Sequence, residues 1–366
     1  MSEKMIEDLD TPSLIIDLDQ METNLMAMQD FADSEGVKLR PHTKTHKTAE
    51  IAHLQMKYGA EGITVAKVSE AEAMVRAGVS DIFIATEIVG KQKLERIRVI
   101  AEKAKIHLAV DSMYHVEQIA DFFGDHVPIE LMLEIDTGQG RCGVKPDEAV
   151  LFAGEMLKRF PLIRLRGIFT HEGHTYNATD KDQMKRIAVN AQADVIKVGK
   201  EIKEKCGIDC EISVGCTLAQ LTREVLPGIT EVRPGTYAFY DAGHAYFLGD
   251  ITYCAATVLA TITSKSSRGD VVADAGAKSM TIDQRSSGVL KTEGFGKIKG
   301  HPDLLIKKLS DEHTVIAAGN SLSIGDRIEI IPNHICPTVN LYDRAYGVRN
   351  GKIEKVFTIN ARGCVQ

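Results

Sequence analysis

The sequence has no hydrophobic run that approaches the ~20 residues of a membrane-spanning helix. Its start, residues 1–8, is polar and acidic and does not resemble a signal peptide. The seven cysteines are scattered, and no two have CxxC spacing. In a chain without an export signal we expect them to be reduced thiols. These absences predict a cytoplasmic protein that does not bind membranes.

An excess of positive charge is also absent. The net charge is −7 and the isoelectric point is about 6.0, so we expect no nucleic-acid partner. The glycine-rich signature of dinucleotide-binding domains does not follow the first predicted strand, which weighs against a Rossmann fold. What remains is an ordinary globular composition, with 44% hydrophobic residues, in a chain long enough for one large and one smaller domain.

Short β-rich runs alternate with helical segments through the first two thirds of the chain. This alternation predicts a parallel sheet covered by helices. Eight strands follow the N-terminal one, the number that closes a (β/α)8 TIM-type barrel, with an open doubly wound sheet as the alternative. The predicted strands are 12–18, 37–40, 62–66, 81–85, 105–110, 129–135, 165–170, 209–214 and 230–233. The predicted helices are 20–34, 48–58, 69–77, 91–103, 113–123, 146–159, 180–206 and 218–226.

From about Tyr240 the pattern changes to short β runs separated by turns, with hardly any long helix. This pattern predicts a mostly antiparallel β domain. We therefore expect a barrel domain at 12–245 and a β domain at 246–366. The leading strand, 12–18, could belong to either domain.

Two histidines and two lysines follow the predicted strand at 37–40: His42, Lys44, His46 and Lys47. Barrels present catalytic groups where their strands end. A lysine in a partly desolvated pocket becomes a better amine nucleophile, as Schiff-base chemistry requires. Lys44 is the inward candidate, and a solvated basic turn is the alternative interpretation.

Further candidates follow later strands of the predicted barrel. Arg141 could hold a ring oxygen or a substrate carboxylate, or could simply pair with Asp136. His171 could lie against a flat ring, or could be a core histidine. The loops after the last two strands offer small and hydroxyl residues, and phosphate sites in barrels recur at the last loops. These residues are Gly215, Thr217, Gly235 and Thr236.

His334 and Cys336 are two positions apart in the β part, so on a strand both side chains would point the same way. Imidazole and thiolate suit Zn²⁺. Two protein ligands would leave coordination positions for water or substrate, as in a catalytic site. The alternative is an exposed histidine beside a buried cysteine.

Together these segments resemble the pyridoxal 5'-phosphate (PLP) enzymes of the alanine-racemase-like class, fold type III. Within that class the chain looks closest to the metal-activated branch of D-serine dehydratase, D-threonine aldolase and 3-hydroxy-D-aspartate lyases. The resemblance covers nearly the whole chain. It rests on residues 10–12, 40–47, 136–143, 233–237 and 334–338.

The resemblance implies a role for each candidate. Lys44 would carry PLP as a Schiff base, and His42 would be a second catalytic residue that tunes the lysine or positions the substrate. The metal, Zn²⁺ or else Mn²⁺ or Mg²⁺, would bind His334 and Cys336 on a β domain brought over the barrel mouth. A homodimer is implied as well. The residues around the cofactor would be Arg141, His171, Tyr176, Gly215, Thr217, Gly235, Thr236 and Tyr237.

In the branch that the chain resembles, the second metal ligand is commonly Cys in dehydratases and Asp in aldolases. Cys336 therefore favours elimination of water from a β-hydroxy D-amino acid, as in D-serine dehydratase. Retro-aldol cleavage is the first alternative. A racemase would need a second base, with Tyr253 and Tyr342 as candidates. A non-catalytic PLP-binding protein is a further alternative, although such proteins usually have a single domain.

Overall fold

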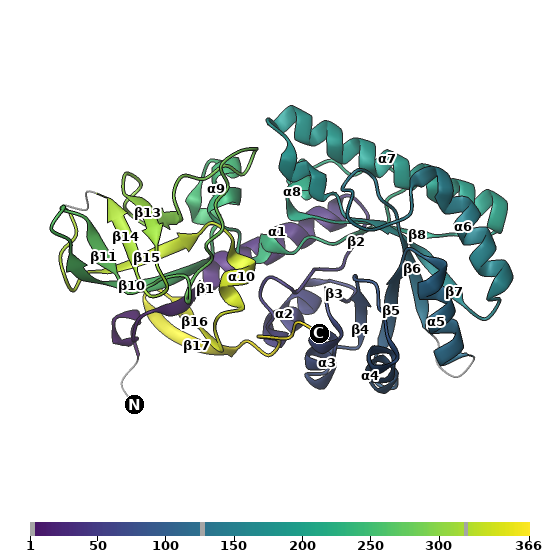
Figure 1. Ribbon diagram of the computed structural model, residues 1–366, viewed down its shortest axis with the longest axis horizontal. Coiled ribbons are helices and arrows are strands. Elements are labelled where there is room, and N and C mark those ends of the chain that lie inside the picture. The colour runs from purple at the N-terminus through teal and green to yellow at the C-terminus, as the bar shows by residue number, and fades with distance from the viewer. Residues whose placement is uncertain (1–3, 125–128, 318–320) are drawn as a thin grey trace. The chain divides into compact units, whose positions relative to one another are not determined.

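The computed structural model describes residues 4–124, 129–317 and 321–366, and the chain forms two compact units that are interleaved along the sequence (Figure 1). The predicted domains 12–245 and 246–366 stay a prediction. The barrel unit contains Met28–Lys44, Ile51–Gly235 and Cys364–Gln366. The β unit contains Met1–Ala27, Thr45–Glu50 and Thr236–Gly363.

Eight parallel strands in the order β2-β9-β8-β7-β6-β5-β4-β3 form the centre of the barrel unit. A parallel bridge between His42 and Thr64 joins the two ends of this order, and the Thr43 N–H donates to the Thr64 carbonyl at 2.9 Å. The predicted fold class is confirmed. The strands are β2 (Lys38–Leu39), β3 (Ile63–Val65), β4 (Asp81–Ile84), β5 (Lys105–Val110), β6 (Glu130–Glu134), β7 (Arg164–Thr170), β8 (Glu211–Val214) and β9 (Glu231–Val232).

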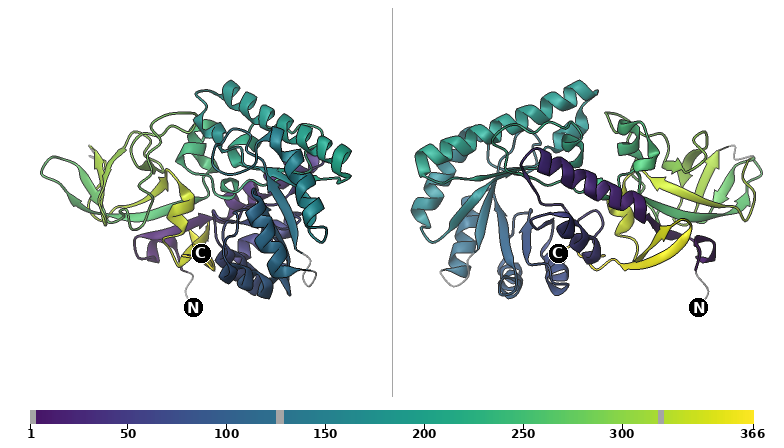
Figure 2. Two further views of the ribbon diagram at one scale, coloured as in Figure 1. Left: turned by 45° about the vertical axis from the view of Figure 1, so that its right-hand side comes forward. Right: turned by 180° about the vertical axis from the view of Figure 1, so that it is seen from behind.

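Amphipathic helices surround these strands (Figures 1 and 2). The longest, α7, begins where the Asp180 side chain accepts the Gln183 N–H and ends at Gly207, which has a left-handed φ of 74°. The prediction of a helix over 218–226 is wrong beyond Gln220, because Arg223 has a φ of 55°, which an α-helix excludes. The helices are α2 (Ala49–Tyr58), α3 (Val68–Arg76), α4 (Lys91–Ala101), α5 (Met113–Phe123), α6 (Pro146–Arg159), α7 (Lys181–Cys206) and α8 (Thr217–Gln220). Helix α1 (Leu18–Ser34) begins in the β unit and enters the barrel unit at Met28.

The β unit contains a mostly antiparallel sheet of nine strands in the order β13-β14-β11-β10-β1-β16-β17, with β15 pairing with β10 and β12. Strand β1 (Ser13–Asp17) lies between β10 and β16, so the leading strand joins this sheet. The other strands are β10 (Ala256–Lys265), β11 (Val271–Ala273), β12 (Gly296–Ile298), β13 (Leu305–Leu309), β14 (Thr314–Ala317), β15 (Arg327–Pro332), β16 (Arg344–Arg349) and β17 (Lys352–Thr358).

Two helices of the β unit, α9 (Ala242–Leu248) and α10 (Ile335–Val339), were not predicted. The expectation that His334 and Cys336 lie on a strand is wrong. His334 is the N-cap of α10 and Cys336 is in its first turn. Pro337 fits there because the first turn of a helix needs no backbone N–H from it. No helix in the described ranges is both long enough and apolar enough to cross a membrane.

Candidate active site

Lys44 lies in the turn that follows β2, at the carboxyl ends of the barrel strands, and is half-buried. Backbone hydrogen bonds fix the approach to this turn. The His42 N–H donates to the Pro234 carbonyl at 2.9 Å, which ties the turn to the segment after β9. The next residues, Thr45, His46 and Lys47, belong to the β unit. The lysine is therefore held where a rigid strand ends and not on a free loop.

Two imidazoles of the barrel unit lie in the electrostatic field of Lys44. Burial, reinforced by the charge of Lys44, lowers the pKa of His42 well below its ordinary range. Burial and the charge of Lys44 also lower the pKa of His171 to about 3. The His171 Nδ1–H donates to the Gly215 carbonyl at 2.7 Å, which fixes the tautomer of this neutral ring. Tyr176 is half-buried in a 3-10 turn (Gly173–Asn177) that follows the same strand, β7.

The small residues after β8 and β9 come together in the barrel unit. The Gly235 N–H donates to Thr217 Oγ1 at 3.2 Å. A Cβ at Gly215 would lie 2.8 Å from the Arg233 Cβ, so only glycine fits at this position. Helix α8 has only four residues and is capped by the sulfur of Cys216, so the binding capacity of this region rests on its loops. Thr236 and Tyr237 follow directly in the chain but belong to the β unit.

Two buried polar side chains near these loops have no hydrogen-bond partner within the described part of the chain. They are Gln220, for both amide atoms, and Glu172, whose carboxyl group has only the Gly215 backbone nearby. Burial raises the pKa of Glu172 to about 8, against the charge of Arg233. A buried polar group without a partner costs about 1–3 kcal/mol. The unpaired amide of Gln220, at the end of the short helix that follows β8, and the small residues Gly215, Thr217 and Gly235 fit the phosphate group of PLP.

Arg141 does not pair with Asp136, which accepts backbone N–H groups of its own loop. The Arg141 Nη2 lies 3.7 Å from Glu134 Oε1. The ligand atoms of Glu134, Glu87 and Cys142 all lie within 4.8 Å of one another. Burial and the neighbouring Glu87 raise the pKa of Glu134 to about 9, so Glu134 is protonated at pH 7. A protonated carboxyl is a poor cation ligand, and we interpret the cluster as support for Arg141.

His334 and Cys336 meet at the start of α10 in the β unit. The His334 Nδ1 lies 2.6 Å from Asp283 Oδ2, and the Cys336 Sγ lies 3.2 Å from Thr45 Oγ1. Burial opposes a charge on His334, but Cys336 and the carboxylates of Asp241 and Asp283 raise its pKa to about 9. The surroundings therefore favour positive charge. An imidazole and a thiol in such surroundings fit a divalent metal such as Zn²⁺.

A buried network of charges near the amino ends of the barrel strands was not predicted. Arg40 Nε donates to Glu231 at 2.7 Å and Nη1 donates to Asp81 at 2.5 Å. Burial opposes these charges, but the hydrogen bond from His107 and the charge of Arg40 lower the pKa of Asp81 to about 2. Arg166 continues the network to Glu130 and Glu211. An acidic residue begins each of β4, β6, β8 and β9, and this is the sequence signal that could have revealed the network.

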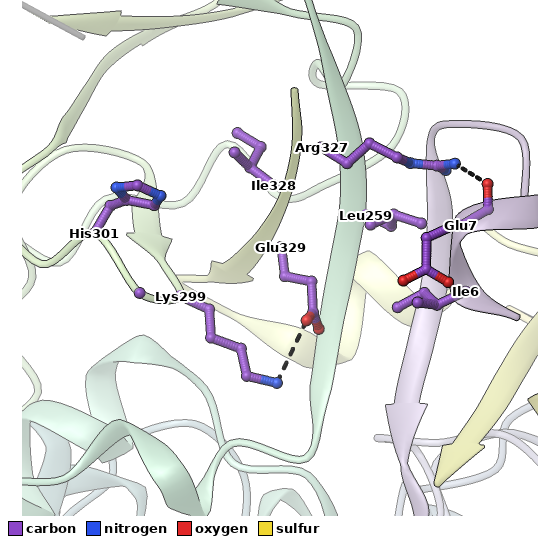
Figure 3. A pocket seen from close by; sticks show the side chains of 9 residues that line it. Ile6, Glu7, Leu259, Lys299, His301, Arg327, Ile328 and Glu329 are labelled. Carbon is purple, nitrogen blue, oxygen red and sulfur yellow. Dashed lines mark hydrogen bonds and ion pairs between the residues drawn. The ribbon is translucent and has the colours of Figure 1, made fainter. Parts of the chain in front are cut away.

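A separate pocket of about 340 Å³ in the β unit contains none of the predicted site residues (Figure 3). Three of its charged side chains are already engaged. Lys299 Nζ donates to Glu329 at 3.4 Å, and Arg327 Nη1 donates to the Glu7 carbonyl at 2.7 Å (Figure 3). This pocket has no group that would perform the chemistry considered for Lys44.

Comparison with known proteins gives two family matches. The family "Alanine racemase, N-terminal domain" matches residues 16–242, and the family "Putative serine dehydratase domain" matches residues 255–348. D-threonine aldolase from Arthrobacter sp is 34% identical over 97% of this chain and 93% of that protein. D-threo-3-hydroxyaspartate dehydratase from Delftia sp. (strain HT23) is 31% identical over 90% of this chain and 92% of that protein.

Solved structures agree with these matches. The crystal structure of D-threonine aldolase from Filomicrobium marinum has a TM-score of 0.89 at 32% identity and covers all of both chains. Structures of a histidine-to-alanine and a cysteine-to-alanine variant of D-threo-3-hydroxyaspartate dehydratase have TM-scores of 0.90 and 0.89 at 29% identity, each over 97% of this chain. The matches cover 96% and 99% of those two chains. The substituted histidine and cysteine are two positions apart, and the cysteine variant is in the metal-free form. The chain therefore belongs to the alanine-racemase-like family of PLP-dependent lyases, in the branch that carries a serine dehydratase domain after the barrel.

Proposed function

We propose that this enzyme is a PLP- and divalent-metal-dependent lyase that eliminates water from a β-hydroxy D-amino acid, as a D-serine dehydratase does. One observation carries the proposal. A lysine at the strand ends of the barrel occurs in one chain with a histidine–cysteine pair in negatively charged surroundings. The spacing of His334 and Cys336 equals that of the two positions substituted in the related dehydratase, whose cysteine variant is metal-free.

Bound PLP supplies a sink for the negative charge left at Cα, and a bound divalent metal supplies Lewis acidity at the β-hydroxyl group. His334 and Cys336 would hold the metal. Lys44 would hold PLP and, once the substrate amine replaces it, would take the proton from Cα at its Nζ. Loss of water from the substrate, followed by hydrolysis, gives a 2-oxo acid and ammonia.

The other residues of the barrel unit position these groups. His42 and His171 are neutral at pH 7 because their pKa values are lowered, so they do not compete with Lys44 for the proton. Gly215, Thr217 and Gly235 would lie around the phosphate, with Thr236 and Tyr237 next in the chain. Arg141 and Tyr176 would flank the ring. The guanidinium of Arg141 lies 3.7 Å from the carboxyl group of Glu134.

Retro-aldol cleavage is the second candidate, because two of the similar proteins are D-threonine aldolases. A racemase is less favoured. One of the two tyrosines considered for its second base, Tyr342, donates its hydroxyl to the Ser279 carbonyl at 2.7 Å. Burial raises the pKa of Tyr342, so this phenol is a poor exchanger of protons. The other, Tyr253, is partly exposed and packs its ring against Tyr240.

The test is to incubate the purified protein, supplied with PLP and Zn²⁺, with D-serine, D-threonine and D-threo-3-hydroxyaspartate and to identify the products. A 2-oxo acid with ammonia supports the dehydratase, and glycine with an aldehyde supports the aldolase. We expect Lys44→Ala to abolish turnover and the yellow colour of bound PLP, whereas Lys38→Ala, which removes an exposed lysine of the same segment, retains both. Unchanged turnover after treatment with a metal chelator would refute the role of the metal.

A further inference from the structure

We propose that Asp283 and Thr45 are positioning residues that prepare His334 and Cys336, respectively, to bind the divalent metal. The inference rests on the proposed function, because it takes His334 and Cys336 as the metal ligands. It adds two residues that lie 51 and 291 positions away from those ligands in the sequence. Neither residue would touch the metal itself.

The first half of the inference concerns the tautomer of His334. Its Nδ1 lies 2.6 Å from the carboxylate oxygen Oδ2 of Asp283. A carboxylate only accepts, so Nδ1 carries a hydrogen, and Nε2 is the ring nitrogen that would bind a metal after it gives up its own proton. A carboxylate behind a histidine ligand fixes the ring orientation and makes the ligand more basic. The side chains remain 35% and 49% exposed, so the carboxylate is at the edge of the site and not in the core.

The loop that carries Asp283 is tied to the turn that carries the ligands. Asn333 Nδ2 donates to the Asp283 carbonyl at 2.9 Å, immediately before the first ligand. The Thr281 N–H donates to Thr338 Oγ1 at 3.1 Å, and Thr338 Oγ1 donates to the His334 carbonyl at 3.0 Å. Hydrogen bonds on both sides of the ligand turn hold the loop in register with it. The carboxylate is therefore held in place before any metal binds.

The second half concerns the thiol of Cys336. Thr45 Oγ1 lies 3.2 Å from the sulfur, and Thr45 is completely buried. A hydroxyl donates readily to a thiolate, which is the form of cysteine that binds a metal. Between the two ligands, the Ile335 N–H donates to Asp241 Oδ2 at 3.4 Å, which fixes the backbone of the turn. Because Thr45 directly follows Lys44 in the chain, one short segment serves the lysine and the metal ligand.

The test measures the affinity of the PLP-loaded enzyme for Zn²⁺ by competition with a chromogenic chelator, so activity is not the readout. We expect Asp283→Asn to weaken binding about 10- to 100-fold, the range found when outer partners of metal ligands are removed. Thr45→Val, which keeps the side-chain shape, should weaken it by about 3- to 10-fold, as for the loss of one hydrogen bond. Asp303→Asn, which removes an exposed carboxylate of the same unit, should leave the affinity unchanged.

Substitution with Co²⁺ separates the two halves. The sulfur-to-cobalt charge-transfer band should persist in Asp283→Asn and shift in Thr45→Val, because only the second change alters the surroundings of the sulfur. Asp283→Glu, which restores a carboxylate, should recover part of the affinity. If Asp283→Asn does not fold, Asp283→Glu and Thr45→Val carry the same test.

Two results would overturn the inference in different ways. Wild-type affinity in both Asp283→Asn and Thr45→Val, with affinity lost in Cys336→Ala, would refute the positioning roles and leave the proposed function intact. Wild-type affinity in Cys336→Ala would mean that this residue is not a ligand. In that case the inference fails together with the metal in the proposed function.

Discussion

Replacing Arg40 by methionine should destabilise the barrel unit strongly, because it leaves two carboxylates of the network without their cation. The side chains of Arg40 and Glu231 are each 1% exposed and are joined by a hydrogen bond of 2.7 Å. Breaking a buried ion pair by removal of one partner costs about 3–5 kcal/mol. At about 2–4 °C per kcal/mol for a domain of 150–250 residues, we expect Tm to fall by roughly 6–20 °C.

Lys38→Met is the matched control. Lys38 lies two residues before Arg40, on β2, and pairs with Glu61 at 2.7 Å, but the two side chains are 46% and 38% exposed. An exposed pair contributes about 0.2–1 kcal/mol, so this variant should unfold close to the wild type. Both substitutions remove one positive charge from the segment 38–40, but only that of Arg40 is buried.

The measurement is urea unfolding followed by circular dichroism, with the midpoint and the slope compared between variants. Adding Glu231→Gln to Arg40→Met should recover part of the loss, since it removes one of the carboxylates left without a partner. A midpoint of Arg40→Met equal to that of Lys38→Met would refute the reasoning. It would mean that the network reorganises or takes up water without a cost in stability.

Three further predictions follow from the same structure. Burial raises the pKa of Glu172 from 4.5 to about 8, so its contribution to stability is complete below about pH 4.5, declines as the pH rises and is lost above about pH 8; Glu172→Gln should flatten the decline of the urea midpoint between about pH 5 and 8, and equal pH profiles would contradict this. Gly62→Ala should lower Tm by several degrees, because the added Cβ would lie 2.7 Å from the Asp81 carbonyl oxygen and would collide with the Arg40 guanidinium. An unchanged Tm would show that the Asp81 carbonyl and the Arg40 side chain can both move aside. Tyr342→Phe should cost about 1 kcal/mol of stability, for the lost bond to Ser279, and should retain lyase turnover, whereas loss of turnover would revive Tyr342 as a base.

The architecture of the barrel could be predicted from local pattern alone. A strand of a parallel barrel is a short apolar run followed by an amphipathic helix, and both periods are visible within 20 to 40 residues of sequence. The position of Lys44 could be predicted for the same reason, since the strand that precedes it ends at Pro41. The homodimer and the cytoplasmic location stay predictions from the sequence.

Contacts between distant segments could not be predicted, because spacing along the chain carries no information about them. Strand β1 pairs with β10 and β16, about 240 and 330 positions later, and its own apolar pattern fits either unit. The sequence pattern around His334 and Cys336 fits a strand as well as a helix start. Its helical start becomes evident only with the partners of the turn, such as the Asp241 carboxylate that accepts the Ile335 N–H.

The sequence by itself determined the fold class, the lysine at the strand end and the residue types suited to a cofactor and a metal, because periodicity and side-chain chemistry are local properties. Tertiary structure alone decided what surrounds these groups. Asp283 stands behind His334, and Thr45 lies against Cys336. Glu134 lies near Arg141. In each case the chemistry of a residue named by the sequence depends on a neighbour that only folding brings within a few ångströms.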